Sequence, residues 1–150
     1  MKIPFRQQPL VLLIEDSMHD FTAIQRAFRK AGFEGHVEHC QKGETALGYL
    51  EQAKADREKE KSNSCLPCFI LLDLNLPGID GIQVLQSIKT DNTLKQIPII
   101  VFTTSQNPQD IKTCYQSGVN SYVTKPMDLA AFNHAIATIS EYWLKTVYLP

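Results

Sequence analysis

The chain has 150 residues, of which 43% are hydrophobic and 21% charged, and its formal net charge is −1. This size and composition are typical of one globular domain, and the near-neutral charge argues against nucleic acid or an anionic membrane as a partner. No apolar run approaches the roughly 18 residues of a membrane-spanning helix. We therefore expect a single domain over residues 1–150 that works in the cytoplasm, away from membranes.

The first half of the chain alternates short apolar runs with segments of helical spacing. The first apolar run is followed at once by Glu15 and Asp16, which is unlike an export signal and leaves residues 1–8 as a short N-terminal arm. In chain order we expect a strand at 10–14, a helix at 17–31, a strand at 37–40, a helix at 44–61 and a strand at 69–74. The strands are apolar runs rather than alternating patterns, which predicts that both faces of the sheet are covered.

The second half continues this alternation after a turn at 75–81. We expect a helix at 82–89, a strand at 97–102, a helix at 108–117, a strand at 121–124 and a long last helix at 128–148. Five strand–helix repeats with buried strands predict an α/β fold with a doubly wound five-stranded parallel sheet.

Polar side chains follow four of the expected strands. Glu15 and Asp16 end the first strand, Asp73 lies near the end of the third, Thr103 ends the fourth and Lys125 follows the fifth. In such sheets the functional crevice lies at the carboxyl ends of the strands. Carboxylates gathered there either gain protons or attract a cation, and oxygen-only ligands suit Mg²⁺ or Mn²⁺. This set favours attack by a carboxylate on phosphorus, with Thr103 and Lys125 holding the phosphoryl oxygens.

The segments IEDS, LLDLNLPGIDG, VFTTS and YVTKP resemble the four signature segments of response-regulator receiver domains, in that family's order and over nearly the whole chain. The resemblance implies the flavodoxin-like (βα)5 receiver fold and a phosphoacceptor function. It implies that Asp73 is phosphorylated and that the metal is held by Glu15, Asp16, Asp73 and the backbone carbonyl of Asn75. Asp16 is the more direct ligand of the acidic pair, whose first member is Glu15 where Asp is also common.

The same resemblance assigns the phosphoryl-binding and switch residues, which are Thr103, Thr104, Lys125 and Tyr122. Thr103 is expected to move toward the phosphoryl group, and Tyr122 then to turn inward. Asn75 and Ser105 are implied to set the rate of dephosphorylation. The family also implies a cis peptide bond at Pro126, although cis forms are only about 5–6% of such bonds in general.

A finer resemblance is to small stand-alone regulators paired with cyanobacterial phytochrome kinases. It rests on DLNLPGIDG, on IKTDNTLKQIPIIVFTTS, on the long stretch 50–66 and on the aromatic tail. It implies a sensor histidine kinase of the phytochrome type as phosphodonor. We expect no enzymatic activity beyond slow self-catalysed phosphotransfer and autodephosphorylation, and we expect no output domain after the receiver. The signal would then leave through the fourth helix, fifth strand and fifth helix.

The end of the chain suggests an interaction surface. A helix of about 20 residues would reach about 30 Å, far enough to overhang a small domain, and residues 142–150 form a helical, aromatic tail. Clustered exposed aromatic side chains indicate a protein–protein contact. We expect a homodimer through the last two helices and the strand between them. The residues expected at this contact are Phe132, Ile136, Tyr142, Trp143, Val147 and Tyr148.

Two other functions fit parts of the pattern. One is a receiver that binds partners without phosphorylation, against which the complete set of site residues argues. The other is an aspartate-nucleophile phosphatase similar to the haloacid-dehalogenase-like enzymes. Those enzymes place a second acid two residues after the nucleophile, where this chain has Asn75. The pair Cys65 and Cys68 precedes a strand, where we expect ordinary thiols, with redox sensing as the less favoured alternative.

Overall fold

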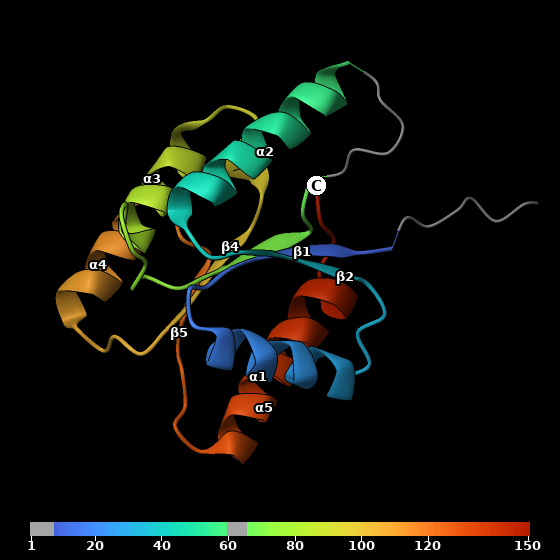
Figure 1. Ribbon diagram of the computed structural model, residues 1–150, viewed down its shortest axis with the longest axis vertical. Coiled ribbons are helices and arrows are strands. Elements are labelled where there is room, and N and C mark those ends of the chain that lie inside the picture. Colours follow the sequence, from blue (N-terminus) through green and yellow to red (C-terminus); the bar gives the residue numbers. More distant parts are fainter. Residues whose placement is uncertain (1–7, 60–65) are drawn as a thin grey trace, which may run out of the picture.

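Five parallel strands form one sheet in the computed structural model, which describes residues 8–59 and 66–150 (Figure 1). The strands are β1 (Leu10–Ile14), β2 (His36–Cys40), β3 (Phe69–Leu72), β4 (Ile99–Thr103) and β5 (Ser121–Thr124). Their order across the sheet is β2-β1-β3-β4-β5, and each neighbouring pair is parallel. The prediction of a doubly wound five-stranded parallel sheet is confirmed.

Helices cover both faces of this sheet. Among the described residues, the α-helices are α1 (Met18–Lys30), α2 (Gly43–Glu58), α3 (Gly81–Thr90), α4 (Pro108–Gln116) and α5 (Leu129–Glu141). Figure 1 shows α1 and α5 on one face and α2, α3 and α4 on the other. A 3₁₀ helix, η1 (Leu94–Gln96), precedes β4, and a π-helical turn, η2 (Tyr142–Thr146), follows α5.

The core consists of two apolar clusters, one on each face of the sheet. Leu12 and Ile14 of β1 belong to the cluster under α2, α3 and α4, whereas Val11 and Leu13 belong to the cluster under α1 and α5. This division follows from the strand geometry, because successive side chains point to opposite faces. Burial on both faces explains why β1 is apolar throughout.

Capping residues make the helices begin close to the carboxyl ends of the strands. The side chains of Ser17, Asp80, Asn107 and Asp128 accept backbone N–H bonds at the starts of α1, α3, α4 and α5. Such caps satisfy N–H groups that have no partner inside the helix. The loops that carry the candidate site residues are therefore short and held at both ends.

The last helix is shorter than predicted. The expected helix at 128–148 ends at Glu141, and the chain then makes the π-helical turn η2, in which the N–H of Val147 donates to the carbonyl of Tyr142 at 3.1 Å. The 13 residues of α5 span about 20 Å, and η2 continues the helical path to Thr146, so the overhang of the tail stays a prediction. The turn lets Trp143 and Leu144 pack against the cluster under α1 and α5.

Most other boundaries agree with the sequence to within a few residues. β1 and β5 have the predicted limits, while α2 ends at Glu58 rather than at residue 61. Residues 1–7 of the expected N-terminal arm and Cys65 lie outside the described residues. Within the described part of the chain, none of the helices combines the length and the apolar character that crossing a membrane requires.

Candidate functional site

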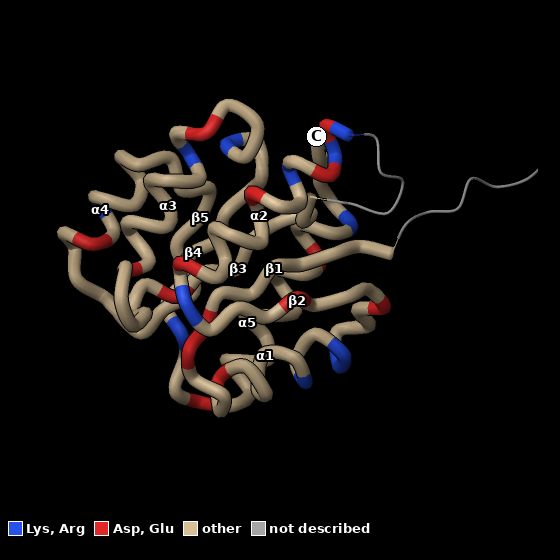
Figure 2. Tube along the Cα trace, turned by 45° about the horizontal axis from the view of Figure 1, so that its top comes forward, with Lys and Arg blue, Asp and Glu red and all other residues tan. Residues whose placement is uncertain are grey.

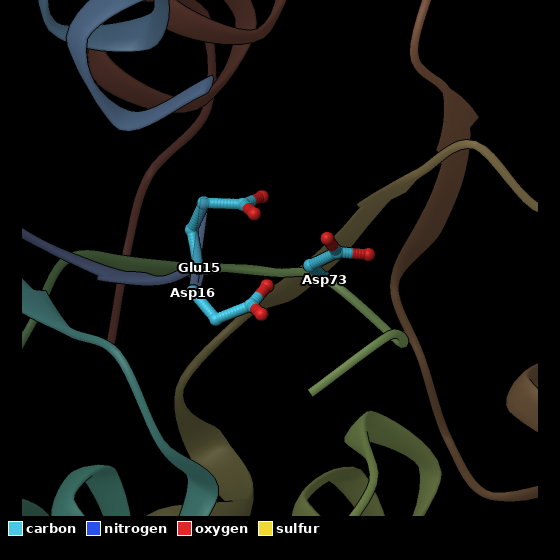
Figure 3. Close-up of side chains that lie close together, drawn as sticks. All are labelled: Glu15, Asp16 and Asp73. Carbon is cyan, nitrogen blue, oxygen red and sulfur yellow. The ribbon is translucent and has the colours of Figure 1, made fainter. Parts of the chain in front are cut away.

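Three carboxylates converge at the carboxyl ends of β1 and β3 (Figure 3). Glu15 and Asp16 follow β1, Asp73 follows β3, and one carboxylate oxygen of each lies within 4.8 Å of the others. Glu15 and Asp73 are buried, whereas Asp16 is exposed. The backbone N–H of Asp73 donates to the carbonyl of Ile14 at 3.0 Å, so the pairing of these strands positions the acids.

The ammonium group of Lys125 lies among these acids. Its Nζ donates to Glu15 Oε2 at 2.7 Å, to Asp73 Oδ2 at 3.0 Å and to Asp20 Oδ2 at 2.8 Å. The backbone N–H of Lys125 donates to the carbonyl of Thr103 at 2.7 Å, which places the lysine just beyond β5. Figure 2 shows acidic residues, in red, gathered at this end of the sheet near the start of α1.

The burial of these groups alters their proton affinities. Burial raises the pKa of Glu15 to about 7, an effect that the hydrogen bond from Lys125 opposes and the charge of Asp73 reinforces. Burial alone would lower the pKa of Lys125, but its bonds to Asp20 and Glu15 raise it above the ordinary value. The site thus holds a charged lysine and an excess of acidic groups. Such a site favours a further cation.

The donor set of the acid cluster fits a divalent metal. Glu15, Asp16 and Asp73 offer only oxygen ligands, and Asp16 leaves the site open to solvent. Mg²⁺ prefers one or two carboxylates together with waters and phosphate oxygens, and Mn²⁺ accepts the same ligands. That the backbone carbonyl of Asn75 is a further metal ligand stays a prediction.

A pH-dependent stability follows from the position of Glu15. The pKa of Glu15 is about 7 in the folded protein, above its ordinary value of 4.5. Its contribution to the free energy of unfolding is therefore complete below about pH 4.5 and is lost as the pH rises through about 7. In chelator, we expect Glu15→Gln to raise the free energy of unfolding at about pH 8 by about 2 kcal/mol relative to the parent, and by much less at about pH 5. Urea unfolding at both pH values measures this difference.

The exposed Glu34 on the loop before β2 provides the control, because Glu34→Gln removes a carboxylate far from the cluster. We expect Glu34→Gln to keep the pH dependence of the parent. Equal pH dependence in Glu15→Gln and the parent would contradict the assignment to Glu15.

Two of the predicted switch residues, Thr103 and Tyr122, are connected through Ser105 on the loop after β4. Thr103 at the end of β4 is buried, and its Oγ1 accepts the backbone N–H of Ser105 at 3.5 Å. The hydroxyl of Tyr122 donates to the carbonyl of Ser105 at 2.8 Å, and the hydroxyl of Ser105 donates to Asp110 Oδ2 at 2.7 Å. The loop after β4 is therefore tied to both β5 and α4. Tyr122 already bonds to this loop here, whereas the sequence placed its inward turn after phosphorylation.

Two predicted residues lie at the rim of the crevice. Asn75 donates its backbone N–H to Asp73 Oδ1 at 3.2 Å, and its side-chain amide lies 3.5 Å from the hydroxyl of Thr104. Both residues are exposed, so solvent reaches this side of Asp73. Their predicted roles at the phosphoryl group stay predictions.

The predicted cis peptide bond at Pro126 is wrong for this structure. No cis bond occurs between residues 8–59 or 66–150, so the bond from Lys125 to Pro126 is trans. The trans form of such a bond is favoured locally by about 0.5–1 kcal/mol. With this bond trans, Lys125 still reaches both Glu15 and Asp73.

The structure also corrects two of the predicted dimer residues. Phe132 and Ile136 are buried in the cluster under α1 and α5, because they face the sheet, and neither can form a contact surface. Tyr142 and Tyr148 are exposed, by 49% and 103%. Trp143 is partly buried against the same cluster.

Sequence reasoning missed Asp20, which shares Lys125 with the acid cluster. Asp20 stands four residues after Asp16, in the first turn of α1, where its side chain lies over the crevice. The signal was present in the chain, since Asp20 falls in the first turn of a helix expected to begin at residue 17, directly after the acidic pair at the end of the first strand. Nothing in the local pattern indicated that the lysine would reach it.

Comparisons with known proteins show which family shares these features. The family model for the response regulator receiver domain matches residues 11–137. The probable methanogenesis regulatory protein FilR2 of Methanothrix harundinacea is 39% identical over 90% of this chain and 83% of its own length. The response regulator Rcp1 of a Synechocystis species is 38% identical over 94% of this chain and 92% of its own.

Solved structures of two such regulators superpose on nearly the whole chain. The phosphorylated cyanobacterial phytochrome response regulator RcpA matches with a TM-score of 0.85 at 40% identity, over 95% of this chain and 99% of that one. The Mn²⁺-bound form of Rcp1 matches with a TM-score of 0.83 at 37% identity, over the same shares of the two chains. The sequence-based resemblance to stand-alone phytochrome regulators is confirmed.

Proposed function

The chain belongs to the response regulator receiver domain family, the phosphoacceptors of two-component signalling, and we propose that Asp73 is its phosphorylated residue, with Mg²⁺ or Mn²⁺ as cofactor. The observation that carries this proposal is the meeting of Asp73 with Glu15, Asp16 and Lys125 at one end of the sheet. A nucleophilic carboxylate, two further oxygen ligands for a metal and a lysine ammonium group suit phosphoryl transfer to an acid.

In the proposed mechanism a carboxylate oxygen of Asp73 attacks the phosphorus of a phosphohistidine. The new P–O bond forms a mixed anhydride, the P–N bond breaks, and the imidazole leaves with a proton from solvent. A metal held by Glu15, Asp16 and Asp73 would supply positive charge that lowers the repulsion between carboxylate and phosphate. Lys125 exchanges a carboxylate partner for a phosphoryl oxygen, and the hydroxyl of Thr103 donates to another.

The hydrogen bonds around Ser105 support a route for the signal. Movement of Thr103 toward the phosphoryl group would pull the loop after β4, to which Tyr122 of β5 and Asp110 of α4 are bonded. A local change of charge would thereby alter the surface formed by α4, β5 and α5. Asn75 and Ser105 flank the approach of water and would set the rate at which the anhydride hydrolyses.

Intact mass after incubation with acetyl phosphate and Mg²⁺ tests this function. We expect a gain of one phosphoryl group that a chelator prevents. No gain under any condition would favour a receiver that binds partners without phosphorylation. Sustained turnover of a small phosphate ester would instead indicate a phosphatase.

We propose a sensor histidine kinase of the phytochrome type as the phosphodonor. We also propose that the protein works in the cytoplasm. The similarity to RcpA, described as a cyanobacterial phytochrome response regulator, supports this partner. A groove of about 740 Å³ between α1 and α5 offers a contact surface in which Met18 and Leu129 are exposed. Faster transfer from a phytochrome-type kinase than from unrelated kinases would support this proposal, and equal rates would contradict it.

We propose that the protein forms a homodimer through α4, β5 and α5, extended by the tail. Exposed Tyr142 and Tyr148 support a tail contact, and exposed Tyr115 and Met127 lie on or beside the other elements. We expect Tyr142→Ser combined with Tyr148→Ser to weaken the dimer by about tenfold or more in dissociation constant, as measured by sedimentation at several concentrations.

Exposed side chains are the right choice for this test, because their loss leaves the core intact. Truncation after Tyr142 would instead remove Trp143, which packs on the cluster under α1 and α5. A double variant with Thr113→Ala in α4 and Thr138→Ala in α5 provides a control that removes no aromatic group. A dimer of unchanged affinity in the tyrosine variant would exclude the tail from the contact.

A further inference from the structure

Lys125 has one carboxylate partner that does not belong to the acid cluster. Its Nζ bonds to Glu15 and Asp73, which are proposed metal ligands, and to Asp20 at 2.8 Å, which is not within the group of converging oxygens. Asp20 comes from α1, whereas the other two partners follow strands. The lysine therefore bridges the acid cluster and a helix beside it.

This bridge creates a competition. A divalent cation at Glu15, Asp16 and Asp73 would bind two of the carboxylates that Lys125 now contacts, and it repels the ammonium group. Lys125 is almost fully buried, with a side chain that is 5% exposed, so it cannot simply turn into solvent. A second anionic partner within reach lowers the free energy of moving the lysine away from the metal ligands.

We propose that Asp20 is a positioning residue, which holds the Lys125 ammonium when a divalent metal takes Glu15 and Asp73 and thereby strengthens metal binding. This inference rests on the proposed metal-dependent phosphoacceptor function. It assigns to α1 a part in preparing the site, without any contact between Asp20 and the metal.

The local structure keeps Asp20 ready for this part. Its backbone N–H donates to the hydroxyl of Ser17 at 3.2 Å, which fixes it in the first turn of α1. A carboxylate at a helix N-terminus is favoured by the helix dipole, and the bond from Lys125 overcomes the effect of burial to lower the pKa of Asp20. Among the described residues, the only other titratable side chain with a hydrogen bond or ion pair to Asp20 is the exposed His19, at 3.4 Å.

Direct titration of the chelator-treated protein with Mg²⁺ by calorimetry tests the inference. We expect Asp20→Asn to weaken Mg²⁺ binding by about tenfold, because Lys125 is then held more tightly by Glu15 and Asp73. The matched control is Asp128→Asn, which removes a charge just beyond Lys125 but keeps a good cap for α5. We expect this control to change the affinity by less than about twofold.

A double-mutant cycle separates positioning from mere charge. In a Lys125→Met background, we expect Asp20→Asn to weaken Mg²⁺ binding by only about twofold, since no lysine remains to be held. A tenfold loss in both backgrounds would overturn the inference, because the effect would then come from charge or from α1 itself. The cycle is repeated with Lys125→Gln, so that poor folding of one variant cannot decide the result.

Two further results complete the test. Asp20→Glu, which keeps an acid within reach of Lys125, should recover most of the lost affinity, and failure to do so would count against positioning. A parent protein that binds Mg²⁺ as tightly as Asp20→Asn would overturn this inference alone. A parent that binds no Mg²⁺ would refute the metal in the proposed function as well.

Discussion

Asp73→Asn is expected to abolish phosphorylation by acetyl phosphate completely while leaving the protein folded. Asn has nearly the same shape as Asp, and its one carbonyl oxygen can still accept one of the two bonds that Asn75 and Lys125 now donate to different oxygens of Asp73. It lacks the anionic oxygen that attacks phosphorus. Intact mass and circular dichroism, measured on the same sample with Mg²⁺ present, test both halves of this prediction.

The matched control for this experiment lies on the same loop. Asp80 is exposed and caps α3, and Asn is an equally good cap. We expect Asp80→Asn to be phosphorylated like the parent. A full phosphoryl gain by Asp73→Asn would place the acceptor elsewhere and would contradict the assignment, with Glu15 and Asp16 as the next candidates.

Lys125→Met is expected to lower the free energy of unfolding in chelator by about 3 kcal/mol, because removing one partner from a buried charge cluster leaves the others uncompensated. Three carboxylates lose their shared cation in this variant. The loss should grow with rising pH, as the acids lose their protons. Urea unfolding with and without Mg²⁺ measures it.

Mg²⁺ should restore more stability to Lys125→Met than it adds to the parent. In the parent the metal must displace the ammonium group, whereas in the variant it meets free carboxylates. Lys112→Met, on the exposed side of α4, should change stability by less than about 0.5 kcal/mol. If Mg²⁺ stabilised the parent and Lys125→Met equally, Lys125 and the metal would not compete.

The sheet and the main site residues could be predicted from the sequence because their signals are local. Apolar runs such as 10–14 alternate with helical segments, and few topologies satisfy that order. Parallel strands bring their carboxyl ends to one edge, so Glu15, Asp73 and Lys125 were expected to meet although they lie far apart in the chain. The structure brings them together.

Other features depended on which surfaces pack together. The apolar stripe of the last helix predicted a buried side but could not separate core residues from contact residues. Phe132 and Ile136 face the sheet, while Tyr142 lies beyond the end of α5 and stays exposed. The helix ends where Trp143 can reach the core. That position depends on the distance from α5 to α1 and to the sheet, and the periodicity of the sequence carries no information about this distance.

By itself, the sequence determined the succession of strands and helices along the chain, the acids at the strand ends and the family to which those acids point. Only the tertiary structure decided that Lys125 is shared by Glu15, Asp73 and Asp20, and that the bond before Pro126 is trans. The physical reason is the range of the interactions. Propensity and periodicity act over a few neighbouring residues, whereas the sharing of one buried cation depends on how α1, β1, β3 and β5 pack against each other.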